Sequence, residues 1–169
     1  MDFEARRRLY LDRIETSLDA ALAGWRAGAE APETRVEDAA PYALLGGGKR
    51  LRAMLALAAG EVCGLEAARA ERLAIAVETL HAYSLVHDDL PAMDDAETRR
   101  GHPSVHRQFD EATAILAGDQ LLTYALGHLA DEPTALRALS GAAAQMVRGQ
   151  MLDLLSENDA VSLDLPALE

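Results

Sequence analysis

An apolar stretch with helical periodicity leads directly into four aspartates that lie within eight residues, at positions 88, 89, 94 and 95. The i, i+3, i+4, i+7 spacing of a helix with one buried face is followed by Leu73, Ala76, Val77 and Leu80. We expect this helix to run to about Asp88 and to end near Pro91, which cannot donate a helical hydrogen bond. The aspartates are therefore predicted to lie at the mouth of a packed helix.

The rest of the chain also favours helices over strands. Half of the residues are apolar but only 4% are aromatic, which favours close packing of helices through Leu, Ala, Val and Met. Strand alternation and hairpin signals are absent, and residues 89–103 are expected to form a loop or a distorted helix end. We predict an all-α chain with about six helices, over residues 11–25, 34–45, 51–62, 66–88, 110–130 and 134–157.

Local signals refine three of these elements. Thr34 and Glu37 have the spacing of a capping box at the start of the second helix. Cys63 lies in an apolar helical run, which suits a buried thiol, and a single cysteine cannot form an intramolecular disulfide. The third helix is predicted to bury a face that consists of Leu51, Leu55, Ala58 and Val62.

Charge and hydropathy exclude several classes of protein. The chain has 16 basic and 28 acidic residues and a net charge of −12, which argues against a nucleic-acid partner, because phosphate backbones require basic surfaces. No apolar run reaches membrane-spanning length, and the N-terminus lacks the apolar region of a secretory signal. With the single cysteine, this predicts a soluble cytoplasmic protein without a membrane partner.

The length of 169 residues suits one domain with a sizeable core. At the end of the chain, Asp164 and Pro166 have the pattern of a helix start, with a cap residue and a proline in the first turn. Because the sequence stops where this helix would begin, we expect residues 1–169 to be one partial domain of a longer protein.

Three glycines precede a dense basic cluster in Gly46–Arg52, at the start of the third helix. Backbone N–H groups, the helix dipole and the side chains of Lys49 and Arg52, three apart and expected to share a face, could together hold a diphosphate. The segment is not a Walker A loop, because Arg50 stands where Ser or Thr is required. A helix–helix turn with solvated arginines is the alternative.

The four aspartates can be separated by their position along the helix. Asp88 and Asp94 are six apart and would diverge on a regular helix, but a bulge at Pro91 could direct both carboxylates to one cavity. Asp89 and Asp95 would then be outer-shell or solvated acids. Mg²⁺ is the expected ion, because it takes few protein carboxylates and completes its octahedron with phosphate oxygens and water.

Cationic and polar residues surround these acids. Arg99 and Arg100 could bind a polyphosphate beside the metal, or could simply compensate the preceding acidic charge. His81, Ser84 and Asp88 share one stripe of the fourth helix. His102 and His106 have the spacing of two zinc ligands, but no third ligand accompanies them, which argues against zinc. Polar residues that interrupt the last apolar helices, structural or functional, are Asp119, Gln120, Gln145, Gln150 and Asp153.

The segment His81–Asp95, followed by Arg99-Arg100-Gly101, resembles the first aspartate-rich motif of the trans-polyprenyl diphosphate synthases. Gly47–Arg52 is similar to the upstream diphosphate-binding segment of that family, and Phe109–Asp119 and Gly149–Leu154 are similar to two further blocks. The nearest likeness is to bacterial enzymes that make farnesyl diphosphate. The resemblance implies the N-terminal portion of an isoprenoid-synthase-type helical bundle; the second aspartate-rich motif of the family would lie downstream of residue 169.

The resemblance also implies roles for individual residues. Asp88 and Asp94 would coordinate Mg²⁺, and Arg99 would contact the allylic diphosphate, which is dimethylallyl or geranyl diphosphate. Isopentenyl diphosphate would be held by Lys49, Arg52, His81 and Arg100. The reaction would be a head-to-tail 1'-4 condensation: the allylic C–O bond breaks, the isopentenyl double bond attacks the carbocation, and a proton is lost to the departing diphosphate.

In this family, side chains one helical turn before the first aspartate limit product length, which implies that Tyr83, with Ser84 beside it, stops the product near fifteen carbons. Departures from the family pattern include Ala53 in place of proline and Arg148 in place of glycine. The resemblance further implies a homodimer and little activity for residues 1–169 alone. Three alternatives stay open: a geranylgeranyl-type synthase fragment, a non-catalytic homologue that pairs with a full-length synthase, and an acidic helical protein without a site.

Overall fold

The computed structural model describes residues 2–27 and 35–157, which form seven helices and two very short strands. No helix among them is both long and apolar enough to cross a membrane. The predicted capping residue Thr34 and the predicted helix start at Asp164 lie outside the described residues. The elements are α1 (Phe3–Ala27), α2 (Arg35–Leu45), α3 (Leu51–Val62), α4 (Ala67–Asp88), β1 (Thr98–Arg99), β2 (His102–Pro103), α5 (Val105–Gln108), α6 (Glu111–Gly127) and α7 (Pro133–Glu157).

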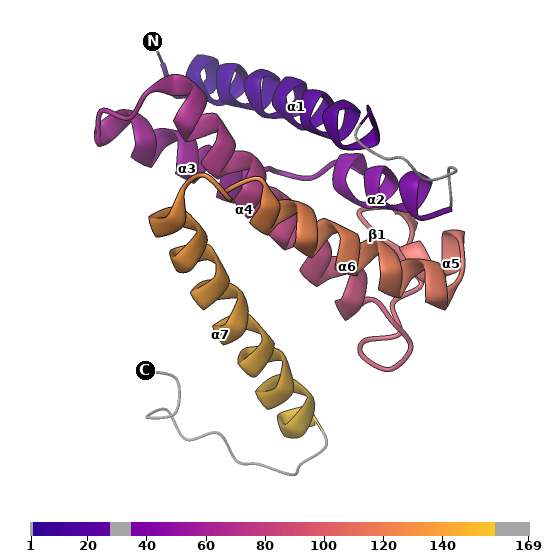
Figure 1. Ribbon diagram of the computed structural model, residues 1–169. Helices are drawn as coiled ribbons and strands as arrows, with labels where there is room; N and C mark the ends of the chain where they lie inside the picture. The colour runs from indigo at the N-terminus through magenta and orange to yellow at the C-terminus, as the bar shows by residue number, and fades with distance from the viewer. Residues whose placement is uncertain (1, 28–34, 158–169) are drawn as a thin grey trace.

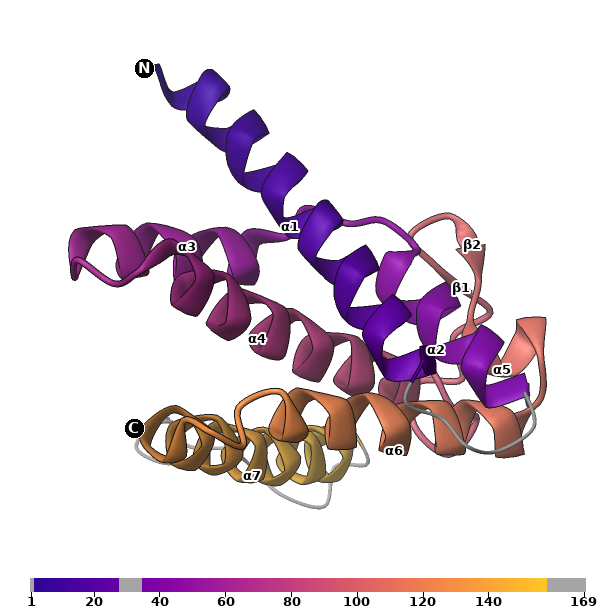
Figure 2. The ribbon, with the colours of Figure 1, turned by 45° about the horizontal axis from the view of Figure 1, so that its top comes forward.

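The helix α4 is the centre of the bundle. It packs against α1, α2, α3, α6 and α7, and its buried residues occupy more than one face because neighbours surround it (Figure 1). The long helix α7 descends away from α1 in Figure 1, and Figure 2 shows it beside α6. This arrangement confirms the prediction of an all-α bundle, and α4 ends at Asp88 as expected.

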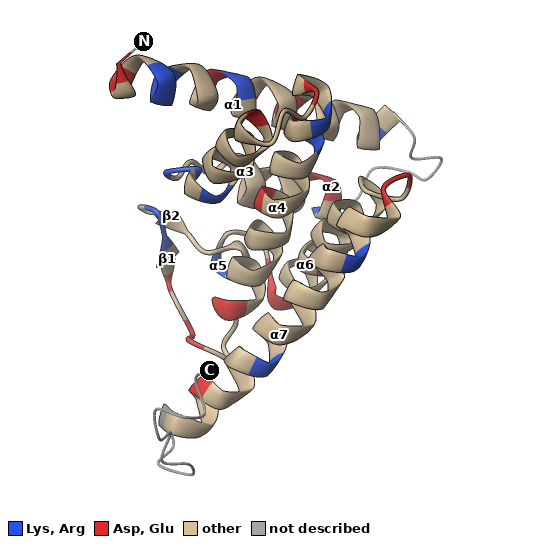
Figure 3. Cartoon of the chain, turned by 90° about the vertical axis from the view of Figure 1, so that its left-hand side faces the viewer, with Lys and Arg blue, Asp and Glu red and all other residues tan. Residues whose placement is uncertain are grey.

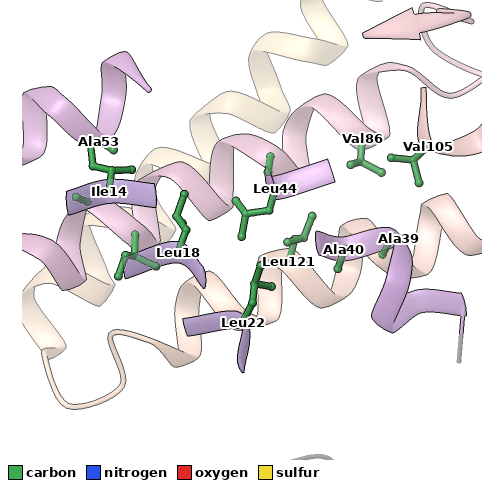
Figure 4. Packing of buried hydrophobic residues seen from close by; sticks show 14 of the residues in the cluster. Ile14, Leu18, Leu22, Ala39, Ala40, Leu44, Ala53, Val86, Val105 and Leu121 are labelled. Atoms are coloured by element: carbon green, nitrogen blue, oxygen red, sulfur yellow. The ribbon is translucent and has the colours of Figure 1, made fainter. Parts of the chain in front are cut away.

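The main core lies between α1, α2, α3, α4 and α6, where the apolar stripes of five helices meet (Figure 4). Leu18 of α1, Leu44 of α2 and Leu121 of α6 have no exposed surface, and each such leucine contributes about 2 kcal/mol of hydrophobic stabilisation. The start of α6 is fixed by Asp110, whose side chain accepts a hydrogen bond from the backbone N–H of Thr113 at 2.7 Å.

The structure corrects two predictions about α3. Leu51, Leu55 and Val62 were expected to be buried, but they are 57%, 61% and 88% exposed. The buried face instead consists of Ala53, Leu57 and Gly60. Two of these three residues are small, because α3 and α4 approach each other closely. Cys63, at the end of α3, is exposed rather than buried.

The segment expected to be a loop contains more structure than predicted. Residues Thr98–Arg99 pair with His102–Pro103 as a minimal antiparallel hairpin, and the short helix α5 follows. The tight turn between the strands uses Arg100 and Gly101, both with positive φ angles. This hairpin places Arg99 and Arg100 between the end of α4 and the start of α3.

Candidate functional site

The chain turns back on itself directly after α4. The backbone N–H of Asp94 donates to the carbonyl of Asp88 at 3.0 Å, and that of Asp95 donates to Leu90 at 3.1 Å. This turn, which contains Pro91, returns Asp94 to the end of α4, as the predicted bulge requires. Asp88 is half-buried and Asp94 is exposed, so both carboxylates can be reached from solvent.

Asp89 differs from its neighbour Asp88. It is 2% exposed and accepts hydrogen bonds from Arg99, one of them from Nε at 2.9 Å. The hydrogen bond that Arg99 donates to Asp89 is the main reason that the pKa of Arg99 is raised above its usual value. Arg99 Nη2 also lies 3.5 Å from Asp88 Oδ2. Arg99 therefore neutralises buried Asp89 and lies next to Asp88.

Asp95 is exposed, as predicted, and is also paired with side chains of α5. Its Oδ1 lies 3.1 Å from Arg107 Nη2 and 3.8 Å from His106 Nε2, and its φ angle of 46° is in the left-handed region. A non-glycine residue in this region is uncommon and requires such support. We call residues 88–95 the aspartate turn. The contacts of Asp95 fix the end of this turn next to Asp94.

Arg52, His81 and Arg100 form a group of basic side chains that we call the cradle. Arg52 Nη1 lies 3.2 Å from His81 Nε2, and Arg100 donates to the carbonyl of Gly47. Gly48 has a φ angle of 124°, which favours glycine, and a Cβ atom there would lie 2.6 Å from the Arg100 guanidinium and displace it. Figure 3 shows the basic start of α3 and the β1–β2 turn on one side of the molecule, with the acidic segment after α4 below them.

Electrostatics show that positive charge accumulates in the cradle. The pKa of His81 is lowered, first by burial and then by the charge of Arg52, with smaller effects of Arg100 and Arg99. The pKa of Arg100 is lowered as well, first by burial and then by the charge of Arg50. Two arginine cations that repel each other, beside the imidazole of His81, are a suitable binding site for a diphosphate.

Lys49 does not share a face with Arg52, contrary to the prediction. The helix begins only at Leu51, so helical spacing does not apply to Lys49. Lys49 is exposed and lines a groove of about 570 Å³ between α1 and α3, together with Leu51 and Leu55.

A cavity of about 350 Å³ lies next to Asp88, between α4, α6 and α7. Tyr83 and Ser84 both line it, as does His87, whose ring centroid lies 4.9 Å from that of Tyr83. The mostly apolar lining suits a hydrocarbon chain that begins near the aspartates.

Gln150 of α7 was not selected by sequence reasoning as a site residue, although its side chain donates to Asp88 Oδ1. Two signals in the sequence pointed to Gln150: it is a polar residue in a stretch rich in Ala and Met, which fits a structural role equally well, and it lies in the Gly149–Leu154 block of the family resemblance. The contact spans 62 residues of sequence and places α7 at the site.

The donor set of the aspartate turn fits Mg²⁺ better than zinc. Among residues 2–27 and 35–157, no group of three or more His, Cys, Asp or Glu side chains is arranged to hold a metal ion. His106 is buried and His102 is exposed, so the two do not form the pair expected of zinc ligands. Mg²⁺ commonly takes one or two protein carboxylates and fills its remaining positions with phosphate oxygens and water.

Burial of histidines should make the fold sensitive to mild acid. The pKa values of His81 and His128 are both lowered, mainly by burial, so these residues stay neutral in the folded state where they would be protonated in the unfolded state. The unfolded state therefore binds more protons as the pH falls through about 6.5, and stability decreases. Urea unfolding at pH 7, 6 and 5 should show that the double variant H81Q/H128Q loses less free energy of unfolding on acidification than the unaltered chain does. An equal loss would contradict the assignment; H102Q, at an exposed histidine, is the matched control.

Comparison with known proteins identifies relatives of this arrangement. Residues 33–167 match the family model described as Polyprenyl synthetase. The chain is 45% identical over 163 residues to farnesyl diphosphate synthase of Haemophilus influenzae, which covers 90% of this chain and 55% of that protein. It is 39% identical over 175 residues to geranylgeranyl pyrophosphate synthase 9 of Arabidopsis thaliana, with 93% and 47% covered.

Solved structures agree with the sequence relatives. Geranyltranstransferase of Thermotoga maritima matches with a TM-score of 0.86 and 31% identity, over 95% of this chain and 59% of that one. The chain spans about half the length of the curated relatives it matches. The helical bundle therefore corresponds to the N-terminal portion of these longer proteins.

Proposed function

The chain belongs to the polyprenyl synthetase family, and we propose that it acts in head-to-tail prenyl transfer from dimethylallyl or geranyl diphosphate to isopentenyl diphosphate. The observation that supports this most is the arrangement around the end of α4. The aspartate turn and the cradle lie on either side of the β1–β2 hairpin, whose Arg99 contacts the acids while Arg100 belongs to the cradle. Two diphosphate-binding regions side by side are what a condensation of two diphosphates needs.

Asp88 and Asp94 would hold Mg²⁺, which supplies positive charge that stabilises the departing diphosphate. Arg99 would contact the same diphosphate, since its guanidinium already borders Asp88 and is anchored by buried Asp89. Gln150 orients the Asp88 carboxylate by its hydrogen bond. The reaction needs no side-chain nucleophile, because the electrons that form the new bond come from the isopentenyl double bond.

Arg52, His81 and Arg100 would bind isopentenyl diphosphate in the cradle, with Lys49 reaching it from outside α3. Tyr83 and Ser84 would limit the product to about fifteen carbons from their place on the wall of the cavity next to Asp88. The relatives include both farnesyl and geranylgeranyl synthases, so the product length rests on Tyr83 and not on their names. A cytoplasmic location and a homodimer stay predictions.

Because the matched relatives are about twice as long, we expect residues 1–169 to provide one wall of the site and to be inactive or nearly so without a second aspartate-rich wall. The test is incubation of the purified chain with Mg²⁺, isopentenyl diphosphate and geranyl diphosphate, followed by product analysis. Little product is expected, and any product should have fifteen carbons. Robust turnover would contradict the need for a second wall, and a twenty-carbon product would contradict the role of Tyr83.

Exposed apolar side chains on α6 and α7 favour a second candidate function, a homologue that pairs with a full-length synthase. Four large apolar side chains on these two helices are each 45% to 56% exposed: Ile115, Leu116, Val147 and Met151. An exposed apolar face of this kind suits contact with another protein. Capture of a full-length farnesyl diphosphate synthase by this chain, unchanged in D88A/D94A, would support the pairing role. Capture that requires both aspartates would argue for the metal site instead.

A further inference from the structure

Arg50 lies between two candidate diphosphate ligands in sequence but points away from both. Its side chain is 1% exposed, whereas Lys49 and Arg52 are exposed. Arg50 Nε donates to Glu15 Oε1 of α1 at 2.7 Å, and Nη2 donates to Glu15 Oε2 at 3.3 Å. Arg50 Nη1 donates to Glu78 Oε1 of α4 at 3.2 Å. A single buried guanidinium therefore ties the start of α3 to two other helices.

The backbone around Arg50 needs this anchor. Gly47, Gly48 and Arg50 all have positive φ angles, and for Arg50 the value is 48°. A left-handed arginine is unfavourable by itself and persists only where the surroundings hold it. The carbonyl of Arg50 accepts the hydrogen bond from Met54 N–H at 2.9 Å, so the same residue also sets where α3 begins and how Arg52 is directed.

Glu78 connects the anchor to the cradle. It is 2% exposed and lies three residues before His81 on α4, and its charge acts on both His81 and Arg100. Its second oxygen, Oε2, is buried and has no hydrogen-bond partner within the described ranges. One buried carboxylate thus pairs with Arg50 and lies close enough to the cradle to influence two of its members.

We infer that Arg50 is a positioning residue, which with Glu15 and Glu78 fixes the Lys49–Arg52 turn so that the cradle is preorganised for isopentenyl diphosphate. This inference rests on the proposed function. A buried ion pair contributes little to net stability, but it can specify one geometry, and loss of a supporting contact is felt by the groups that bind ligand. A lysine cannot replace the arginine fully, because it lacks the fork that reaches both glutamates.

The test measures binding of isopentenyl diphosphate to the 169-residue chain without metal, and Mg²⁺-dependent binding of a bisphosphonate, by calorimetry. R50M should weaken isopentenyl diphosphate binding about tenfold or more, while the bisphosphonate affinity changes less than about twofold. R50K should be intermediate. The matched control is R72M, which removes a 2.6 Å ion pair with Glu132 far from the cradle. R72M should lower the melting temperature without a selective loss of affinity for isopentenyl diphosphate.

Glu15→Gln keeps the inference falsifiable if R50M does not fold, because Glu15 is 44% exposed and its loss leaves the Arg50–Glu78 pair in place. E15Q should weaken isopentenyl diphosphate binding about threefold or more. Normal affinity in folded R50M, or in E15Q, would overturn the inference while R52A still abolished binding. Absence of binding by the unaltered chain would overturn the proposed function and the inference with it.

Discussion

Asp88→Ala should abolish Mg²⁺-dependent binding of a bisphosphonate, with a loss of affinity of at least about a hundredfold, since even partners of metal ligands commonly matter ten- to a hundredfold. The structure gives the reason: Asp88 is the half-buried acid at the end of α4, beside the turn that returns Asp94. Removal of its carboxylate leaves Arg99 and Gln150 without their contacts there. Calorimetric titration at a fixed Mg²⁺ concentration measures the effect.

The matched control for D88A is D131A, which removes an exposed aspartate in the turn between α6 and α7. Both variants lower the acidic charge by one, so a general electrostatic effect would appear in both. D94A should resemble D88A. Unchanged bisphosphonate binding in D88A would exclude Asp88 as a metal ligand.

Gly60→Val should strongly destabilise the bundle, because it forces apart the contact between α3 and α4. A Cβ at position 60 would lie 2.7 Å from Ala70 Cβ and 3.6 Å from Leu65 Cδ1, so α3 and α4 would have to separate. Overpacking of this kind costs typically 1–3 kcal/mol, and a valine should lower the free energy of unfolding by about 3 kcal/mol. Urea unfolding at pH 7 provides the measurement.

Ala59→Val is the control for Gly60→Val, because residue 59 is the exposed neighbour on the same helix. Both variants place a β-branched side chain in α3, but helix propensity disfavours Ala59→Val and slightly favours Gly60→Val, because glycine is a weaker helix former than valine. A larger loss of stability in Gly60→Val therefore reports the contact with Ala70. Equal stability of the two variants would contradict the close approach of α3 and α4.

Helix positions could be predicted from the sequence where large apolar residues face a broad core. Ala76 and Leu80 of the stripe expected on α4 are buried, and Asp88 ends α4 where Pro91 interrupts the pattern. The prediction of the buried face of α3 failed because burial there depends on the size of the side chain as well as on its hydropathy. Close contact with α4 selects Ala53 and Gly60, while the larger Leu55 is left outside.

The site was predictable in its local parts and not in its long-range contacts. The six-residue spacing of Asp88 and Asp94 around Pro91 predicted a bulge, and the backbone hydrogen bond from Asp94 N–H to the Asp88 carbonyl shows that the chain turns back there. That both carboxylates point into one cavity stays a prediction. No spacing rule could show that Arg50 turns inward while Lys49 and Arg52 stay exposed, because this depends on a left-handed backbone and on Glu78, 28 residues away. Gln150 was missed for the same reason.

The central claim is that the end of α4 is a metal-dependent diphosphate site. The most direct measurement is the melting temperature of the 169-residue chain with a bisphosphonate alone, with Mg²⁺ alone, and with both. The account predicts a clear increase only when both are present, because carboxylates and phosphate oxygens must share the ion, and predicts its loss in D88A. An equal increase without Mg²⁺, or one that persists in D88A, would contradict it.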